Sequence, residues 1–163
     1  LGSEQHARGA GNVHGVATTG FRFFNVYGPR QDPLSPYSGV ISIFANRLAA
    51  GEPVTIFGDG EQTRDFVYVA DVVRHLIAGM QKAALAAPVY NVCTGRKTDV
   101  LTLATTIAEL LQTKPDIRFG APRPGDIMHS LGNPSAAAQD LSVTAEVSLT
   151  EGLGHLLNSV RSE

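Results

Sequence analysis

Arg64 and Arg123 are the residues of this sequence whose type and surroundings are most suited to chemistry with a ligand. Arg64 lies between the turn at 58–60, which holds two glycines, and a β-rich run, while Arg123 lies in a loop of prolines and glycine at 122–126. A guanidinium beside a tight turn can donate paired hydrogen bonds to a phosphate, so two such residues suit a diphosphate. The other interpretation is two surface ion pairs, which would stabilise little. The sequence alone leaves both open.

Asn25 and Asp126 are polar residues in comparable settings. Asn25 comes at the end of a bulky run, 21–24, where an Asn either caps a loop or offers an amide that donates to and accepts from a ligand. Asp126 ends the loop of Arg123 and is either a cap of the next element or a ligand acceptor. These four residues are therefore the starting candidates for a site that binds an anionic small molecule.

Cysteine and histidine indicate no further chemistry. Cys93 is the single cysteine, which supports neither a disulfide framework nor a thiolate metal site, and it is expected to be buried and structural. The five histidines have no metal-ligand spacing, so we predict no metal site. His75 falls in a predicted helix and is expected to be partly exposed and structural.

The composition predicts one ordinary folded domain. With 163 residues, 43% of them hydrophobic and 17% charged, the chain can bury a core and is not disordered by composition. A net charge of −2 argues against a nucleic-acid surface, which needs concentrated Lys and Arg. No apolar run approaches the roughly 20 residues of a membrane span. We expect a cytoplasmic location and no nucleic-acid or membrane partner.

Short strands and helices alternate along the chain, which predicts a mixed α/β fold. The expected strands lie at 21–26, 54–57, 65–69, 89–92 and 117–119. The expected helices lie at 3–13, 40–50, 71–84, 101–111, 135–140 and 150–160.

Two of the expected helices have distinctive first turns. Asp71 is expected to be the N-cap of the helix at 71–84, and Thr98 or Asp99 that of the helix at 101–111. The apolar residues of the helix at 71–84 recur at helical spacing and should form one stripe along the helix. They are Val72, Val73, Leu76, Ile77 and Met80.

Three segments together resemble the extended short-chain dehydrogenase/reductases, in particular the UDP-sugar 4-epimerases. They are RFFNVYGPR at 22–30, FGDGEQTRDFVYVAD at 57–71 and RPGD at 123–126. Two motifs of that family are absent: no Gly-x-Gly-x-x-Gly follows a strand, and no tyrosine has a lysine four residues on. The resemblance therefore implies the C-terminal half of such an enzyme.

That half would consist of the last part of a Rossmann-type domain and a small mixed α/β domain that binds the nucleotide sugar. The resemblance implies a residual Rossmann helix and strand at 1–30 and a nucleotide-sugar-binding domain at 31–163. A strand and helix within 66–98 would contribute back to the Rossmann part.

The resemblance also implies roles for individual residues. Asn25, Arg64 and Arg123 would contact the diphosphate, and Asp126 would accept from the ribose hydroxyls. Positions that match the uracil pocket are Val40, Thr55 and Phe57. Gln62 would support the turn and contact the ligand, and Phe24 matches a position near the nicotinamide ring of NAD. Each also has a structural interpretation, as a strand, turn or core residue.

Ser130 is the remaining candidate, at the position that borders the sugar in the resembled epimerases. A large aromatic residue there restricts the pocket to plain hexoses, whereas serine would leave room for a 2-acetamido group. The other interpretation is a turn serine. Beyond it the chain departs from the family, which usually has Ala-Asp before the next helix where this chain has Gly132-Asn133.

In the family's reaction NAD takes a hydride from sugar C4 and returns it to the other face, with a tyrosine as base and a lysine that lowers its pKa. Residues 1–7 resemble the helix directly after that lysine. We therefore expect the catalytic lysine to precede Leu1 in the parent protein, and the 163 residues alone to be inactive.

The expected partners are a UDP-sugar, the N-terminal NAD-binding half and, in the intact protein, a second copy in a homodimer. Two alternative functions stay open. One is a nucleotide-sugar 4,6-dehydratase or reductase, and the other is a non-catalytic protein that binds a sugar nucleotide or dinucleotide with the same fold.

Overall fold

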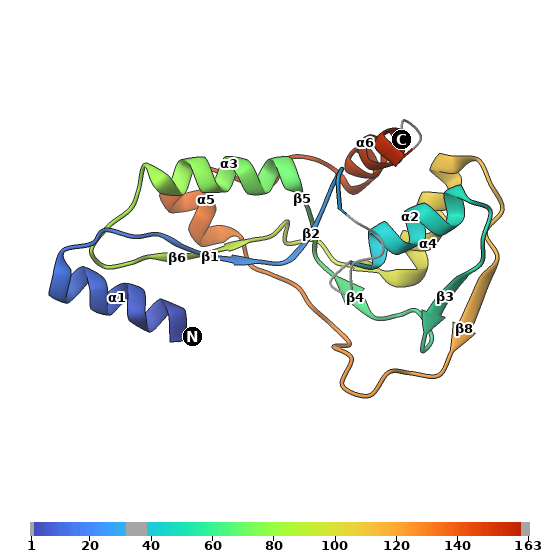
Figure 1. The fold of residues 1–163 in the computed structure, drawn as a ribbon, viewed down its shortest axis with the longest axis horizontal. Coiled ribbons are helices and arrows are strands. Elements are labelled where there is room, and N and C mark those ends of the chain that lie inside the picture. Colours follow the sequence, from blue (N-terminus) through green and yellow to red (C-terminus); the bar gives the residue numbers. More distant parts are fainter. Residues whose placement is uncertain (1, 32–38, 161–163) are drawn as a thin grey trace.

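The computed structural model describes residues 2–31 and 39–160. The prolines and glycine of the run 27–37 predict a loop, and part of that run lies outside the described residues. Figure 1 shows a mixed α/β chain in which short strands alternate with helices, as predicted. The helices are α1 (Gly2–His14), α2 (Val40–Ala49), α3 (Val69–Met80), α4 (Val100–Leu111), α5 (Ser135–Leu141) and α6 (Leu149–Val160). The strands are β1 (Gly20–Phe23), β2 (Asn25–Tyr27), β3 (Val54–Phe57), β4 (Thr63–Arg64), β5 (Phe66–Tyr68), β6 (Val89–Val92), β7 (Thr98–Asp99) and β8 (Ile117–Gly120).

The strand predicted at 21–26 is two strands that belong to different sheets. β1 pairs in parallel with β6, and β2 pairs in parallel with β5. The change of partner falls between Phe24, whose N–H donates to Val92 O at 3.1 Å, and Asn25, whose N–H donates to Asp65 O at 3.0 Å. A strand can change partner without changing its own apolar pattern, so periodicity did not indicate the break. The break places Asn25 where the two sheets meet.

The strand predicted at 65–69 is the shorter strand β5, and Asp65 separates it from β4. β4 pairs antiparallel with β7, and the sequence predicted neither of these two strands. The Asp65 side chain is fully buried. Its carboxylate accepts from Thr94 N–H at 2.8 Å, the Thr94 hydroxyl at 2.7 Å, Gly95 N–H at 2.9 Å and Gly132 N–H at 3.3 Å. Asp65 therefore joins three separate stretches of the chain at one point.

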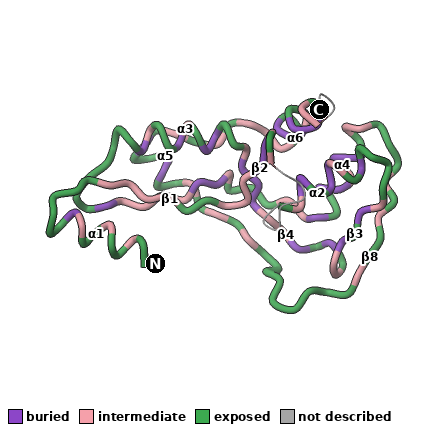
Figure 2. Tube along the Cα trace, viewed as in Figure 1, coloured by how far each residue is buried: buried purple, intermediate pink, exposed green. Residues whose placement is uncertain are grey.

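The main hydrophobic core lies among α2, α4 and α6 and the strands β3 and β5. Figure 2 shows buried positions along these elements, in purple. Leu103, Ile107 and Leu153 are among its fully buried side chains. Asp99 caps α4 by accepting from Thr102 N–H at 2.6 Å, which confirms Asp99 rather than Thr98 as the N-cap. Beside this core, β3 pairs in parallel with β8.

A second group of elements surrounds the β1–β6 pair. Figure 1 shows α3 and α5 on one side of that pair and α1 on the other. Tyr90 of β6 packs with Ala137 and Leu141 of α5 in a small core of its own, and Val67, Val72 and Val92 form another. No helix within residues 2–31 and 39–160 is long and apolar enough to cross a membrane.

The apolar stripe predicted on α3 is mostly exposed in the part of the chain that the structure describes. Val72 is buried, but Val73, Leu76, Ile77 and Met80 are exposed. The buried positions of the helix are Asp71, Val72, His75 and Gly79. Helical spacing therefore located the helix correctly without indicating which face the described residues cover.

Candidate functional site

The site begins at the turn that follows β3. Gly58 and Gly60 both have φ +86°, a left-handed conformation that favours glycine, so the chain reverses sharply between Phe57 and Gln62. The largely buried Gln62 side chain donates from Nε2 to Phe57 O at 2.8 Å and closes the turn. The reversal places β4, and with it Arg64, beside the end of β3.

Arg64 is held in place by the segment that carries Asp126. Its Nη2 donates to Asp126 Oδ1 at 2.6 Å, and its Nη1 donates to Ile127 O at 2.5 Å and to Thr63 O at 3.0 Å. The Arg64 side chain is 17% exposed and the Asp126 side chain 37%, so the pair is partly shielded from water. The structure thus brings together two residues, 62 positions apart, that the sequence assigned to separate contacts.

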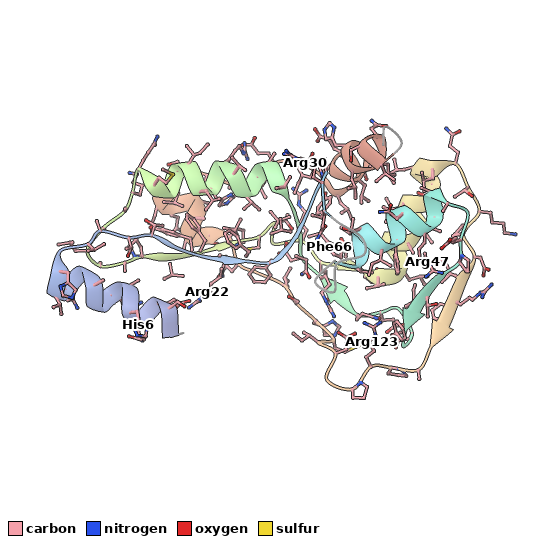
Figure 3. The ribbon with its side chains drawn as sticks, viewed as in Figure 1. His6, Arg22, Arg30, Arg47, Phe66 and Arg123 are labelled. Atoms are coloured by element: carbon pink, nitrogen blue, oxygen red, sulfur yellow. The ribbon has the colours of Figure 1, made fainter. Side chains whose placement is uncertain are left out.

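Arg123 reaches the same place from the same segment. The segment is bound to β4 by two backbone hydrogen bonds, Thr63 N–H to Met128 O at 2.8 Å and Ser130 N–H to Thr63 O at 3.0 Å. The Arg123 guanidinium lies 3.8 Å from the centroid of the Phe57 ring, in a cation–π contact. Figure 3 shows Arg123 beside the β3–β4 turn. Stacking on Phe57 orients a side chain that would otherwise be mobile at the surface.

Asn25 faces the two arginines from the junction of β1 and β2. Its Nδ2 donates to Asp65 O at 3.2 Å, the same carbonyl that accepts its backbone N–H. Because that carbonyl can only accept, it fixes which end of the amide faces it. Asp65 therefore sets the orientation of Asn25 as well as the position of Arg64, its neighbour in the chain.

These residues line one cavity of about 200 Å³. Every predicted substrate-binding residue except Ser130 contributes: Asn25, Val40, Thr55, Phe57, Gln62, Arg64, Arg123 and Asp126. The volume is below the roughly 300–1,000 Å³ of pockets that enclose a drug-sized ligand, so these residues can enclose only part of a nucleotide sugar. With two arginines against one aspartate, the lining favours an anionic ligand.

Three lining residues were not predicted as site residues: Phe44, Ile56 and Val100. Phe44 and Ile56 are buried core residues that form the floor of the cavity. The helical spacing of α2 indicated that Phe44 faces inward, but nothing local indicated Val100, which begins α4 on the far side of the cavity.

Ser130 and Phe24 line a neighbouring pocket, with Asn25, Arg22, Phe23 and Asn91. Asn25 lines both pockets, so the two adjoin at its side chain. The predicted sugar-side residue and the predicted cofactor-side residue are therefore neighbours, next to the cavity that holds the arginines.

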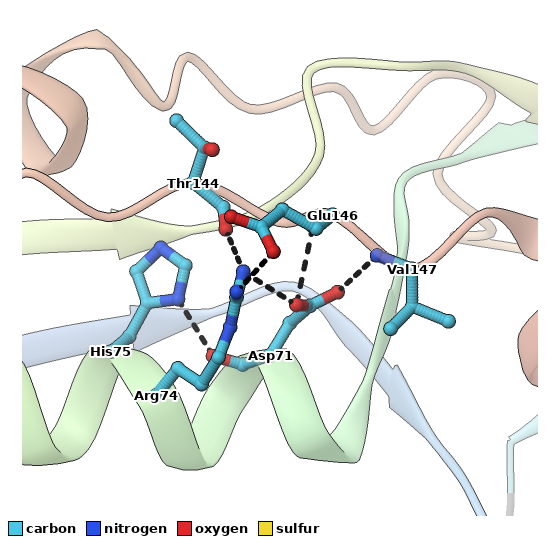
Figure 4. A network of polar contacts seen from close by, with 6 residues as sticks. All are labelled: Asp71, Arg74, His75, Thr144, Glu146 and Val147. Carbon is cyan, nitrogen blue, oxygen red and sulfur yellow. Dashed lines mark hydrogen bonds and ion pairs between the residues drawn. The ribbon is translucent and has the colours of Figure 1, made fainter.

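Asp71 and His75 lie outside the site, and both predictions for them are wrong. Tyr68 is the N-cap of α3, and Asp71 is a buried residue of the first turn. Figure 4 shows its carboxylate accepting from the backbone N–H groups of Glu146 and Val147, at 3.2 and 3.0 Å, and pairing with Arg74. The Asp71 carboxylate thus accepts hydrogen bonds from the segment before α6, and not from the N-terminal N–H groups of α3. His75 is fully buried, with Nδ1 2.7 Å from Asp71 O.

Cys93 is fully buried, as predicted, and burial together with the nearby Asp65 raises the pKa of its thiol to about 11. In the unfolded chain the pKa is about 8.5, so the native state holds the proton more tightly. This contribution to stability is complete below about pH 8.5 and is lost as the pH rises towards 11. We expect iodoacetamide at pH 8 to leave Cys93 unmodified until urea unfolds the protein, as read by peptide mass mapping.

The matched control for this prediction is Cys93→Ala, which removes the titrating group. Its urea midpoint should fall less than that of the parent between pH 8.5 and 10.5. Rapid modification of native Cys93 at pH 8 would contradict the prediction.

No group of three or more His, Cys, Asp or Glu side chains that could hold a metal ion exists among the residues that the structure describes.

Comparison with known proteins identifies relatives over most of the chain. Residues 1–93 match the NAD dependent epimerase/dehydratase family. UDP-glucose 4-epimerase of Mycolicibacterium smegmatis is 37% identical over 139 residues, which cover 85% of this chain and 44% of that protein. UDP-sugar decarboxylases also occur among the relatives. The chain spans about half the length of the curated relatives it matches.

Solved structures agree with the sequence relatives. The crystal structure of a UDP-glucose 4-epimerase with UDP-glucose from Thermotoga maritima is 38% identical with a TM-score of 0.94, over 99% of this chain and 51% of that one. UDP-N-acetylglucosamine 4-epimerase from Methanobrevibacter ruminantium M1, in complex with UDP-N-acetylmuramic acid, is 32% identical with a TM-score of 0.91, over 98% and 51%. With its three sequence segments, its parallel strand pairs and these matches, the chain belongs to the NAD dependent epimerase/dehydratase family.

Proposed function

We propose that this chain is the substrate-binding half of an NAD-dependent UDP-sugar 4-epimerase. The observation that carries the proposal is the cavity in which Asn25, Arg64, Arg123 and Asp126 converge from three separate stretches of the chain. Surface ion pairs alone would not require the two arginines to share a cavity with an oriented amide. Relatives named as UDP-glucose 4-epimerases support the choice of reaction.

The geometry supports a contact order along the ligand. Thr55, Phe57 and Val40 lie on the β3 and α2 side of the cavity and would contact the uracil, with Gln62 supporting the turn between them and Arg64. Arg64 and Arg123 would bind the diphosphate, and Asp126 the ribose hydroxyls. Because ribose and diphosphate are adjacent in a nucleotide, the 2.6 Å Arg64–Asp126 pair is compatible with one ligand that contacts both residues.

Residues of this chain do not fit a complete NAD site. A dinucleotide needs a glycine-rich turn that opens a helix, and none of the helices in residues 2–31 and 39–160 begins in one. Phe24, partly buried beside Ser130, is the residue that would approach the nicotinamide. We therefore assign to this chain only the binding and orientation of the sugar nucleotide.

An N-terminal NAD-binding half would cover surfaces that the described residues leave open. The α3 stripe of Val73, Leu76, Ile77 and Met80 is exposed, and the parallel β1–β6 pair consists of two strands only. Parallel sheets are normally larger and covered on both faces. We assign α1, β1, α3 and β6 to the Rossmann part. We add α5 to this part because α5 packs on β6 and α3, and we assign the other elements to the nucleotide-sugar domain.

A homodimer of the intact protein stays a prediction.

Ser130 extends the proposal to the sugar. Its side chain lines the pocket that Phe24 also lines, and because it is small it would leave room for a 2-acetamido group. The relative named for UDP-N-acetylglucosamine supports this choice. UDP-GlcNAc is therefore the first substrate to test.

Turnover assays test the proposal directly. The intact protein that contains these 163 residues should interconvert UDP-GlcNAc and UDP-GalNAc with NAD, and calorimetry should show UDP binding. The 163-residue chain alone should give no turnover with UDP-GlcNAc and NAD, because this half holds no candidate acid/base pair. Turnover by the chain alone, or failure of the intact protein to bind UDP, would refute the proposal.

A further inference from the structure

Gly132 lies where a side chain would overlap its neighbours, although its backbone conformation does not require glycine. Gly95 and Gly125 have φ of 72° and 80°, where other residues are strained, but Gly132 is not among the residues with positive φ. A methyl group at Gly132 would overlap Cys93 Sγ and stand 2.7 Å from Cys93 Cβ and 2.8 Å from Phe24 Cζ. Real Cβ atoms almost never come this close to another heavy atom.

The side chains around Gly132 differ in their freedom to give way. Cys93 is fully buried after the end of β6, so its sulfur has no open space to enter. Phe24 is only partly buried and meets Gly132 with the far end of its ring. The Phe24 ring is therefore the group that a larger residue at 132 would displace.

The Gly132 segment itself is held and cannot simply retreat. Gly132 N–H donates to Asp65 Oδ2 at 3.3 Å, and Asn91 Nδ2 donates to Asn133 O at 3.3 Å. Two residues earlier, Ser130 N–H donates to Thr63 O at 3.0 Å. Ser130 is thus fixed to β4 while Gly132 is pressed against Phe24 and Cys93.

We propose that Gly132, packed on Cys93, is a positioning residue that sets the separation of Phe24 and Ser130. Phe24 and Ser130 line the same pocket, so a change in this separation changes the shape of that pocket. The statement that this pocket receives the sugar rests on the proposed function. The steric effect of Gly132 on the separation of Phe24 and Ser130 does not depend on it. Gly132 and Cys93 therefore act on the sugar end of the ligand and leave the uridine diphosphate end untouched.

Gly132→Ala in the intact protein is the test, with UDP binding and UDP-sugar turnover as paired readouts. We expect the UDP affinity to stay within about twofold, because neither arginine moves, while kcat falls by up to roughly 100-fold, a loss that a displacement of about 1 Å can cause. Adding Cys93→Gly removes the Sγ and Cβ overlaps, so the new methyl can tilt into the vacated space and away from the Phe24 ring without movement of the segment. This should recover at least about tenfold of the loss. Crystal structures should show the Phe24 ring displaced in the single variant and returned towards its place in the double variant.

Gly154→Ala is the matched control, since a Cβ on this α6 residue meets nothing within 4 Å. It should change neither UDP binding nor turnover. An unchanged distance between Phe24 and Ser130 in Gly132→Ala would overturn the proposal, as would UDP affinity and turnover falling in parallel without rescue by Cys93→Gly. Loss of UDP binding by the unaltered protein would refute the proposed function, while the crystallographic distance would still decide the role of Gly132.

Discussion

Arg64→Met in the intact protein should weaken UDP binding by roughly 100-fold. Two charge-assisted hydrogen bonds to the diphosphate would be lost, which costs about 3 kcal/mol. The change also releases Asp126 and Ile127 O, both of which Arg64 holds, so the loop that carries Arg123 loses an anchor. Isothermal calorimetry with UDP measures the effect. Arg64→Lys should recover only part of it, because an ammonium group cannot make the same paired contacts.

The matched control is Arg118→Met. Arg118 lies on β8, is 64% exposed and pairs with Asp116 at 2.9 Å, outside the cavity. Its replacement should leave the affinity for UDP unchanged, since exposed ion pairs contribute little. Equal effects of the two substitutions would mean that overall charge, and not the position of Arg64, determines binding.

Asp65→Asn should produce the largest loss of stability, at least about 3 kcal/mol in the free energy of unfolding. Each carboxylate oxygen accepts two hydrogen bonds: Oδ1 from the N–H and hydroxyl of Thr94, and Oδ2 from the N–H groups of Gly95 and Gly132. Whichever way the amide of Asn is turned, its NH₂ group faces at least one buried N–H donor. Urea denaturation measures the change.

Asp116→Asn serves as the control for Asp65→Asn. The Asp116 side chain is 56% exposed and pairs only with Arg118 in the described structure, so its substitution should change stability by less than about 0.5 kcal/mol. If Asp65→Asn cost less than about 1 kcal/mol, Asp65 would not be the junction that its hydrogen bonds indicate. A loss of UDP binding at low urea concentration should accompany the destabilisation, because Asp65 O orients Asn25.

The helices and most strands were predictable because their signals are local. Apolar spacing located α2, α4 and α6, and the short polar side chains before α4 limited its N-cap to Thr98 or Asp99. The site residues were predictable for another reason. Their motifs resemble a family whose members use them together, and the cavity indeed gathers Asn25, Arg64, Arg123 and Asp126. Spacing along the chain could not have shown that 25, 64 and 123 converge.

Contacts between distant segments determined the features that the sequence did not predict correctly. The breaks at Phe24 and Asp65 depend on which strand lies alongside, and the adjacent apolar runs are compatible with either partner. Asp71 looked like a helix cap, yet its carboxylate binds the backbone at 146–147, some 75 residues away. His75 is buried, and the α3 stripe is exposed, because burial is a property of what packs on a helix and not of its own sequence.

The sequence by itself therefore determined the family, the mixed α/β class and the residues that we propose to bind a ligand, since each depends on residue type and short spacing. Only the tertiary structure showed that Arg64 pairs with Asp126, that Asp65 joins three segments, and that Gly132 is pressed between Cys93 and Phe24. These features arise from close approach of segments far apart in the chain. Such approach is governed by volume and hydrogen-bond geometry in three dimensions, which no local pattern records.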